Sequence, residues 1–171
     1  MTGRARDLLI APHPVLTTTA DPVDPADPAV IEAAADLLAT LRETAPRTGL
    51  SAPQIGLSWR LIAFDAGRHP RSRSSAGELV VVNPLLAQAS HWESGMESCV
   101  SVGGLAGEVA RAGRIVVHGS LPGTGAPVTI QADAFEARCI QHQLDHLDGL
   151  LFLDRVSRAL TLHHRPHSCD A

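Results

Sequence analysis

The chain contains the stretch QHQLDH at residues 141–146. On a helix, His142 and His146 project from the same face because they are four residues apart, and two histidines so placed can hold one metal ion. In zinc hydrolases with the pattern His-Glu-x-x-His, the glutamate is the general base. Here that position is Gln143. The pair alone does not establish a metal site, which needs a third ligand.

The helix that carries this stretch is predicted to begin at Asp133 and to run to Asp148. Glu136, three residues after Asp133, completes the pattern of a capping box. Gly149 then follows at the position where glycine commonly ends a helix.

A second helix is predicted upstream over residues 29–44, with Asp27 as its cap and Pro28 as its first residue. Its expected buried stripe consists of Ile31, Leu37, Leu38 and Leu41. Strands are expected at residues 60–65, 78–83, 114–118 and 128–131. Strands with two separate helices predict an α+β fold. We expect residues 1–156 to form a single domain and residues 157–171 a short, flexible tail, in which His163, His164 and His167 are incidental.

The composition excludes several classes of protein. The chain has 171 residues, a net charge of -4 and only 3% aromatic residues, which argues against nucleic-acid binding. All 14 basic residues are arginine and tyrosine is absent, so lysine Schiff-base chemistry and a tyrosine acid are excluded. No apolar run is long enough to cross a membrane and no signal peptide is recognised, so a cytoplasmic location is expected.

Three cysteines in a chain that is not rich in disulfides favour reduced thiols or a metal ligand. Cys99 lies in a short polar segment after a strand and is a candidate third ligand, although a free cysteine is more often a small buried side chain. Cys139, three residues before His142, is a candidate core residue.

Three motifs in order resemble those of the peptide deformylase family, over about residues 9–156. Residues 47–54 read RTGLSAPQ and are similar to the family's G-x-G-x-A-A-x-Q. Residues 97–101 read ESCVS and resemble E-G-C-L-S. Residues 142–146 read HQLDH and resemble H-E-x-D-H.

The resemblance implies antiparallel sheets around a central metal-binding helix. It implies one divalent metal held by Cys99, His142 and His146, Fe²⁺ in the native state or Zn²⁺ or Ni²⁺ as isolated, with a fourth position for water. The implied activity is hydrolysis of the N-formyl group from an N-terminal formyl-methionine, with release of formate, during protein biosynthesis.

The resemblance also assigns roles around the metal. The side-chain amide of Gln54 and the backbone N–H of Val100 would stabilise the oxyanion that forms from the formyl carbonyl. Gly49 and Leu50 would contact the substrate. Glu97 and Arg111 would form an ion pair that braces the cysteine segment, although two solvated charges are the alternative.

Gln143 departs from the family pattern at the residue that moves the proton. An amide has no proton to exchange in the working pH range, and general acid–base catalysis is worth about 10²–10⁴-fold. We therefore expect weakened activity. The glutamine is either a substitution made to trap a complex or a natural divergence; Arg47 and Ser98, in place of motif glycines, favour divergence. His91 or a nearby carboxylate would be the only substitute proton carrier.

Arg138 lies one helical turn before His142 and on its face. We hypothesise that it adapts the pocket, with Arg47, to a polar or carboxylate-bearing substrate; the alternative is that it faces solvent or pairs with Glu136 or Asp133. Three functions therefore stay open: a deformylase, an amidase or deacylase of a polar small molecule, and a catalytically silent metal-binding relative. We expect a monomer or weak dimer, and no ribosome docking because the tail lacks a long basic helix.

Overall fold

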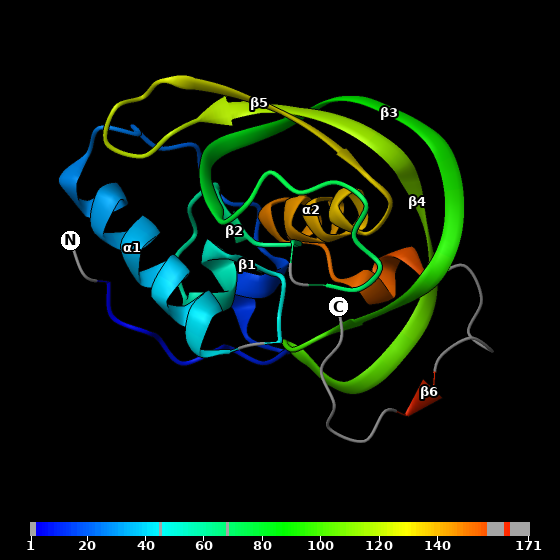
Figure 1. The fold of residues 1–171 in the computed structure, drawn as a ribbon. Helices are drawn as coiled ribbons and strands as arrows, with labels where there is room; N and C mark the ends of the chain where they lie inside the picture. Colours follow the sequence, from blue (N-terminus) through cyan, green and yellow to red (C-terminus); the bar gives the residue numbers. More distant parts are fainter. Residues whose placement is uncertain (1–2, 45, 68, 157–162, 165–171) are drawn as a thin grey trace.

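A computed structural model of the chain describes residues 3–44, 46–67, 69–156 and 163–164 (Figure 1). The helices are α1 (Pro28–Glu43) and α2 (Ala134–Leu147), with short 3-10 turns η1 (Pro14–Thr17), η2 (Ala52–Ile55) and η3 (Phe152–Arg155). The strands are β1 (Gly49–Ser51), β2 (Leu61–Phe64), β3 (Leu79–Cys99), β4 (Val102–Ser120), β5 (Pro127–Asp133) and β6 (His163–His164).

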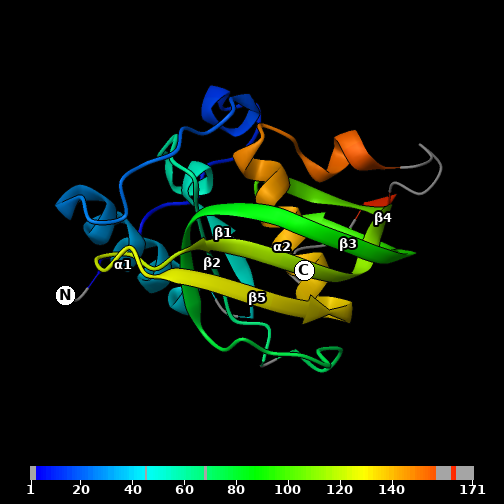
Figure 2. The same cartoon turned by 90° about the horizontal axis from the view of Figure 1, so that it is seen from above.

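The strands form a sheet in the order β1-β2-β3-β4-β5, with every neighbouring pair antiparallel and β6 added to β4. Figure 1 shows the long β3–β4 hairpin curving around α2, and Figure 2 shows α1 at the far end of the sheet. The expected α+β fold, an antiparallel sheet around a central helix, is confirmed.

Strand β2 separates two parts of the core because its side chains alternate between the faces of the sheet. Ile62 and Phe64 pack in the cluster that contains α2. Leu61 and Ala63 pack in the cluster that contains α1. Burying each of the larger side chains contributes about 1.5–3 kcal/mol, so both helices are anchored to the same strand.

Both predicted helices are present. Asp27 caps α1 by accepting a hydrogen bond from the backbone N–H of Ala29 at 2.8 Å. Gly149 follows α2 in a left-handed conformation with φ 72°. The expected buried stripe of α1 was partly wrong, because Leu37 and Leu41 are buried whereas Ile31 and Leu38 are half-buried.

The capping box predicted at the start of α2 was wrong. Glu136 accepts hydrogen bonds from Ser74 Oγ at 2.6 Å and from the backbone N–H of Ala76 at 2.7 Å. The backbone N–H of Asp133 donates to the same Ser74 hydroxyl at 3.0 Å. The carboxylate therefore holds the loop between β2 and β3 against the start of α2, a long-range contact that the local pattern does not reveal.

The strands predicted at residues 78–83 and 114–118 are only parts of much longer strands. Register shifts interrupt the β3–β4 pairing between Val82 and Leu85, between Leu86 and Gln88, and between Ser98 and Cys99. Such bulges break the alternation of polar and apolar residues on which a sequence prediction depends. Residues 85–94 are all exposed, so this part of β3 has no buried face and shows no alternation of buried and exposed residues.

Of the expected tail, only residues 163–164 are described, and they pair as β6 with Leu105 and Ala106 of β4. The rest of that segment, with the histidine at position 167, lies outside the described residues, so the proposed division of the chain stays a prediction. None of the helices described is long and apolar enough to cross a membrane.

Candidate active site

Two elements bring together the three predicted metal ligands. Cys99 is the last residue of β3, while His142 and His146 lie on adjacent turns of α2. One ligand atom from each residue lies within 4.8 Å of the others, and all three side chains are buried. The Cys99 sulfur is 3.2 Å from Nε2 of His146. In the described part of the chain, this is the one group of three such side chains close enough to hold a metal ion.

The ionisation of these groups suits a cation. Burial alone would raise the pKa of the Cys99 thiol, but His146 and His142 outweigh it and hold that pKa well below its usual value. Cys99 is therefore a thiolate, the form that binds metals. Burial lowers the pKa of His142, but Cys99 and Glu97 raise it to about 10, and the proton so held is one that a metal ion would displace.

Glu97 fixes the orientation of His142. Its Oε2 lies 3.1 Å from Nδ1 of His142, which leaves the other ring nitrogen to face Cys99. Arg111 donates to both oxygens of Glu97 at 2.9 Å. Although burial raises the pKa of Glu97, the hydrogen bonds from His142 and Arg111 hold it well below its usual range. A carboxylate behind a metal-binding histidine sets its ring orientation and increases its basicity.

The predicted pairing of Glu97 with Arg111 is part of a larger buried network. Nη1 of Arg111 also donates to Asp145, which accepts from the half-exposed Arg155 at 2.9 Å. Nη1 of Arg138 donates at 2.8 Å to Oε1 of Glu97, the oxygen that also accepts from Nε of Arg111. The pair is buried, so the alternative of two solvated charges was wrong.

Gln54 is held with its amide nitrogen toward the three ligands. Its carbonyl oxygen accepts from the backbone N–H of Ser51 at 3.0 Å and from the Ser51 hydroxyl at 3.2 Å. Its Nε2 therefore points the other way, 3.8 Å from the Cys99 sulfur and 3.2 Å from Ser101 Oγ. A buried amide donor beside the ligands fits the predicted role as an oxyanion donor.

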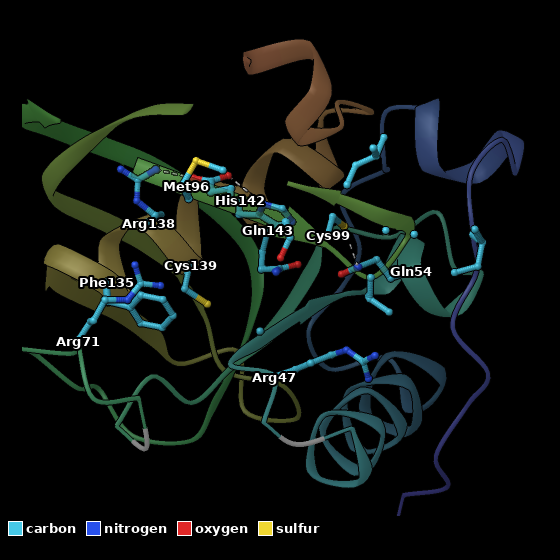
Figure 3. Close-up of a pocket in the computed structure, with 18 residues that line it drawn as sticks. Arg47, Gln54, Arg71, Met96, Cys99, Phe135, Arg138, Cys139, His142 and Gln143 are labelled. Atoms are coloured by element: carbon cyan, nitrogen blue, oxygen red, sulfur yellow. Dashed lines mark hydrogen bonds and ion pairs between the residues drawn. The ribbon is translucent and has the colours of Figure 1, made fainter. Parts of the chain in front are cut away.

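These residues border a cavity of about 300 Å³ (Figure 3). It is lined by Ile10, Arg47, Gly49, Gln54, Arg71, Met96, Glu97, Ser98, Cys99, Val100, Gly103, Gly104, Leu105, Phe135, Arg138, Cys139, His142 and Gln143. Val100 stands in the two-residue turn after Cys99. Leu50 is fully buried beside α1 and is absent from the lining, so its expected contact with the substrate stays a prediction.

Gly49 lets β1 approach α2 closely. A Cβ at this position would lie 2.7 Å from the Cys139 sulfur and 3.1 Å from Nε2 of Gln143. The glycine is therefore required by packing against α2. Burial raises the pKa of the Cys139 thiol to about 12, so it stays protonated, in agreement with its predicted place in the core.

Gln143 occupies the position of the missing base. The residue is 4% exposed, and Figure 3 shows its side chain between Cys99 and Cys139 on the wall of the cavity. Its carbonyl oxygen is buried and accepts no hydrogen bond from any described residue. The site therefore presents a neutral amide where an acid–base group is expected.

Arg138 lies at the cavity, and the partners predicted for it were wrong. Besides Glu97, its guanidinium donates to the backbone carbonyl of Val109 at 3.0 Å and to that of Glu93 at 3.1 Å. A Cβ on Gly95 would lie 2.9 Å from Nη2 of this guanidinium, so Gly95 makes room for it.

The comparisons with known proteins give one answer. The sequence profile of a family described as polypeptide deformylase matches residues 5–161. The chain belongs to this family. A peptide deformylase from Acidothermus cellulolyticus is 38% identical over 151 residues, 88% of this chain and 78% of that protein. A relative from Halothermothrix orenii is 36% identical over 145 residues, covering 85% and 89%.

Solved structures agree. The peptide deformylase from Legionella pneumophila matches with a TM-score of 0.80 at 32% identity, covering 92% of this chain and 88% of that one. The enzyme from Synechococcus elongatus, solved in complex with actinonin, has a TM-score of 0.79 at 33% identity over 94% and 84% of the two chains. Deformylase membership makes this chain a metal-dependent hydrolase with a site for one divalent metal.

Three features of this deformylase site were missed from the sequence. The side chain of Gln141 pairs with both backbone groups of Ala112, at 3.1 and 2.8 Å. Arg71 and Phe135 line the cavity together, with Arg71 5.1 Å above the phenyl ring. Arg71 lies on a polar loop with no periodicity, so no local signal identifies it. Gln141 directly precedes His142. An amide next to a metal ligand on a buried helix could have indicated a side chain that holds the helix to a neighbouring strand.

His91 does not replace the missing base. It is exposed, hydrogen-bonds to Ser90 at 3.0 Å and lines a different cavity from the one beside the three ligands. Arg47 does line the ligand cavity, but Figure 3 shows it on a different side from Arg138. The hypothesis that the two arginines adapt the pocket together therefore stays a prediction.

Proposed function

We propose that the protein hydrolyses the N-formyl group from the amino terminus of a formylated peptide and releases formate, with formyl-methionine as the reference substrate of the family. The observation that carries this proposal is the convergence of Cys99, His142 and His146 beside the oriented amide of Gln54. All of these groups open onto one cavity or lie directly behind it.

Cys99, His142 and His146 would hold one divalent metal ion, which we propose to be Fe²⁺ in the native state and Zn²⁺ or Ni²⁺ as isolated. The bound ion supplies Lewis acidity, which polarises a carbonyl and makes water a nucleophile at neutral pH. A thiolate with two imidazoles is a ligand set that such ions accept. Glu97 keeps His142 in position through Nδ1.

The rest of the site acts on the formyl group. The Nε2 of Gln54 and the backbone N–H of Val100 stabilise the negative charge that develops on the formyl oxygen when the carbonyl carbon becomes tetrahedral. Ser51 holds the carbonyl end of Gln54, so the donor is oriented before the substrate arrives. Hydrolysis breaks the C–N bond, and the nitrogen must gain a proton as it leaves.

Gln143 cannot deliver that proton. It keeps the size and place of a glutamate, but its amide does not titrate in the working range. We therefore propose that formate release is slow, by about 10²–10⁴-fold relative to a chain with glutamate here. Binding of metal and substrate does not need this proton and is retained.

The test is the variant Gln143→Glu, assayed for formate release from a formyl-methionyl peptide with metal content measured on each preparation. We expect about 10²–10⁴-fold higher kcat with unchanged metal stoichiometry. Gln88→Glu, at an exposed position of β3, is the matched control for adding one negative charge. Metal-loaded Gln143→Glu that releases no formate would contradict the proposed activity, and absence of stoichiometric metal would contradict the site.

We also propose a cytoplasmic location and a monomer or weak dimer. Free, buried thiols at Cys99 and Cys139 support a reducing compartment. Sedimentation over a range of protein concentrations measures the oligomeric state.

A further inference from the structure

We propose that this cavity selects a formylated substrate whose first side chain carries a carboxylate, bound between Arg138 and Arg71. The inference rests on the proposed function, because it concerns the residue that bears the formyl group. It names a specificity determinant and a substrate class for the same site.

The cavity runs along α2 from the three ligands toward the start of the helix. Arg138 precedes His142 by one turn and Phe135 by two, so at 1.5 Å per residue they lie about 6 and 10 Å farther along the axis. Figure 3 shows Cys99 and Gln54 at one end of the cavity, and Arg138, Phe135 and Arg71 at the other. With the formyl group at the ligands, the neighbouring side chain extends toward these arginines.

The guanidinium of Arg138 is pre-organised and keeps N–H groups that no described residue uses. Its three hydrogen bonds with described residues use both N–H groups of Nη1 and one of Nη2. A guanidinium has five N–H donors, so Nε and the second N–H of Nη2 remain for a ligand. These three hydrogen bonds keep the group in place, which lowers the entropy cost of binding.

Arg71 supplies the second cation from the loop between β2 and β3. Its guanidinium lies 5.1 Å above the Phe135 ring and forms no ion pair with any carboxylate in the described ranges. His69 stacks on the same ring at 3.6 Å and accepts the backbone N–H of Arg71 at 3.2 Å. The loop therefore holds Arg71 over the cavity.

The balance of charge favours an anion. The buried carboxylates Glu97 and Asp145 are shared by Arg111, Arg138 and Arg155, which leaves one positive charge in excess. The cavity itself is lined by Arg47, Arg71 and Arg138 against Glu97 and the Cys99 thiolate. Gln143 adds no negative charge.

The same two arginines border a second cavity of about 650 Å³ beyond Phe135. Arg73, Arg114 and His91 line it together with Glu93 and Asp133. Cationic side chains thus continue past the end of the first cavity, and a cleft lined mainly by one sign of charge concentrates ligands of the opposite sign.

The test measures binding and turnover separately on the zinc-loaded protein. Formyl-Glu-Ala, its neutral isostere formyl-Gln-Ala and formyl-Met-Ala are titrated by calorimetry. Because hydrogen bonds to charged groups are stronger than neutral ones, we expect formyl-Glu-Ala to bind at least about tenfold more tightly than formyl-Gln-Ala. Added salt screens the charges and should reduce this preference. The same three peptides are then assayed for formate release with Gln143→Glu.

Two variants locate the determinant. Arg71→Ala changes an exposed loop residue and is expected to reduce the preference for formyl-Glu-Ala by about fivefold or more, while formyl-Met-Ala binding changes less than about twofold. Arg71→Lys should restore part of the preference. Arg73→Ala removes one charge from the same loop without touching the first cavity and is the matched control.

The outcomes are separable. Binding of formyl-Met-Ala at least as tight as that of formyl-Glu-Ala overturns the inference, as does an equal effect of Arg71→Ala and Arg73→Ala. If the preference for formyl-Glu-Ala holds but Gln143→Glu releases no formate from any peptide, the carboxylate subsite stands and the proposed deformylase activity fails. If Gln143→Glu releases formate but prefers formyl-Met-Ala, the proposed deformylase activity stands and the carboxylate subsite fails.

Discussion

The two ends of the cavity along α2 differ in what holds them. At the ligand end, Cys99 comes from a long strand, His142 and His146 come from a buried helix, and Glu97 and Arg111 cross-brace them. At the arginine end, one wall is a loop that contacts α2 through Phe135 and Glu136. The three ligands and Glu97 lie in the motifs of the deformylase family, whereas Arg71, Phe135 and Arg138 of the arginine end lie outside these motifs.

This difference separates chemistry from selection. Positions on sheet and helix hold groups more exactly than positions on loops, and loops tolerate substitution better. The reacting groups of this deformylase therefore lie on the rigid side. Of the two arginines that we assign to substrate choice, Arg71 lies on the adaptable loop, whereas Arg138 lies on α2. Gln143 is the exception, because it departs from the family motif although it lies on the rigid side.

The largest effect is expected at the ligand end. In the Gln143→Glu background, Cys99→Ala removes the thiolate ligand and should abolish both stoichiometric zinc and formate release. Metal analysis after gel filtration measures the first and a formate assay the second. Cys139→Ala is the matched control because the Cys139 thiol is protonated and lies outside the ligand group. Retained zinc in Cys99→Ala would show that the ligands were misassigned.

The buried network gives the next effect. Arg111→Leu leaves Glu97 and Asp145 without their shared cation, and loss of one partner from a buried pair costs about 3–5 kcal/mol of unfolding free energy. Arg155→Leu removes a half-exposed partner of the same Asp145 and should cost only about 0–1 kcal/mol. Urea denaturation of the two variants measures both. Similar losses would mean that the brace at the ligand end is no stronger than a surface pair.

Gln54 tests the oxyanion donor without disturbing the metal. Gln54→Ala in the Gln143→Glu background should lower kcat by about 10²–10³-fold, because one donor to the developing charge is lost. Zinc stoichiometry should not change, since Gln54 is not one of the three ligands and makes only a long hydrogen bond of 3.8 Å to the Cys99 sulfur. A loss of zinc together with kcat would assign Gln54 to support of the ligands instead.

The smallest effect is expected at the arginine end. Gly95→Ala places a Cβ 2.9 Å from the Arg138 guanidinium and should cost about 1–3 kcal/mol of unfolding free energy through overpacking. Gly103→Ala is the control on the partner strand, because a Cβ there meets no atom within 4 Å. Thermal unfolding of the two variants gives the comparison. Equal stability would show that Arg138 moves freely and is not pre-organised.

The sequence predicted the fold class and the three side chains that meet at the candidate metal site because each depends on a local signal. The histidine spacing, the helix caps at Asp27 and Gly149, and the three motifs are all readable in short windows. The extent of β3 and β4 was not predictable, since bulges and exposed residues remove the alternation. The partner of Arg138 was not predictable either, because Glu97 is 41 residues away in sequence.

The side chain of Gln141 has one further consequence. A helix that is buried on every side could still turn about its own axis without exposing new surface. Gln141 engages both the N–H and the carbonyl of Ala112, as a neighbouring strand would. This contact fixes the rotation of α2, and His142, the next residue along, inherits its direction from it. The direction of the histidines is thus set from another face of the helix by an amide that does not line the ligand cavity.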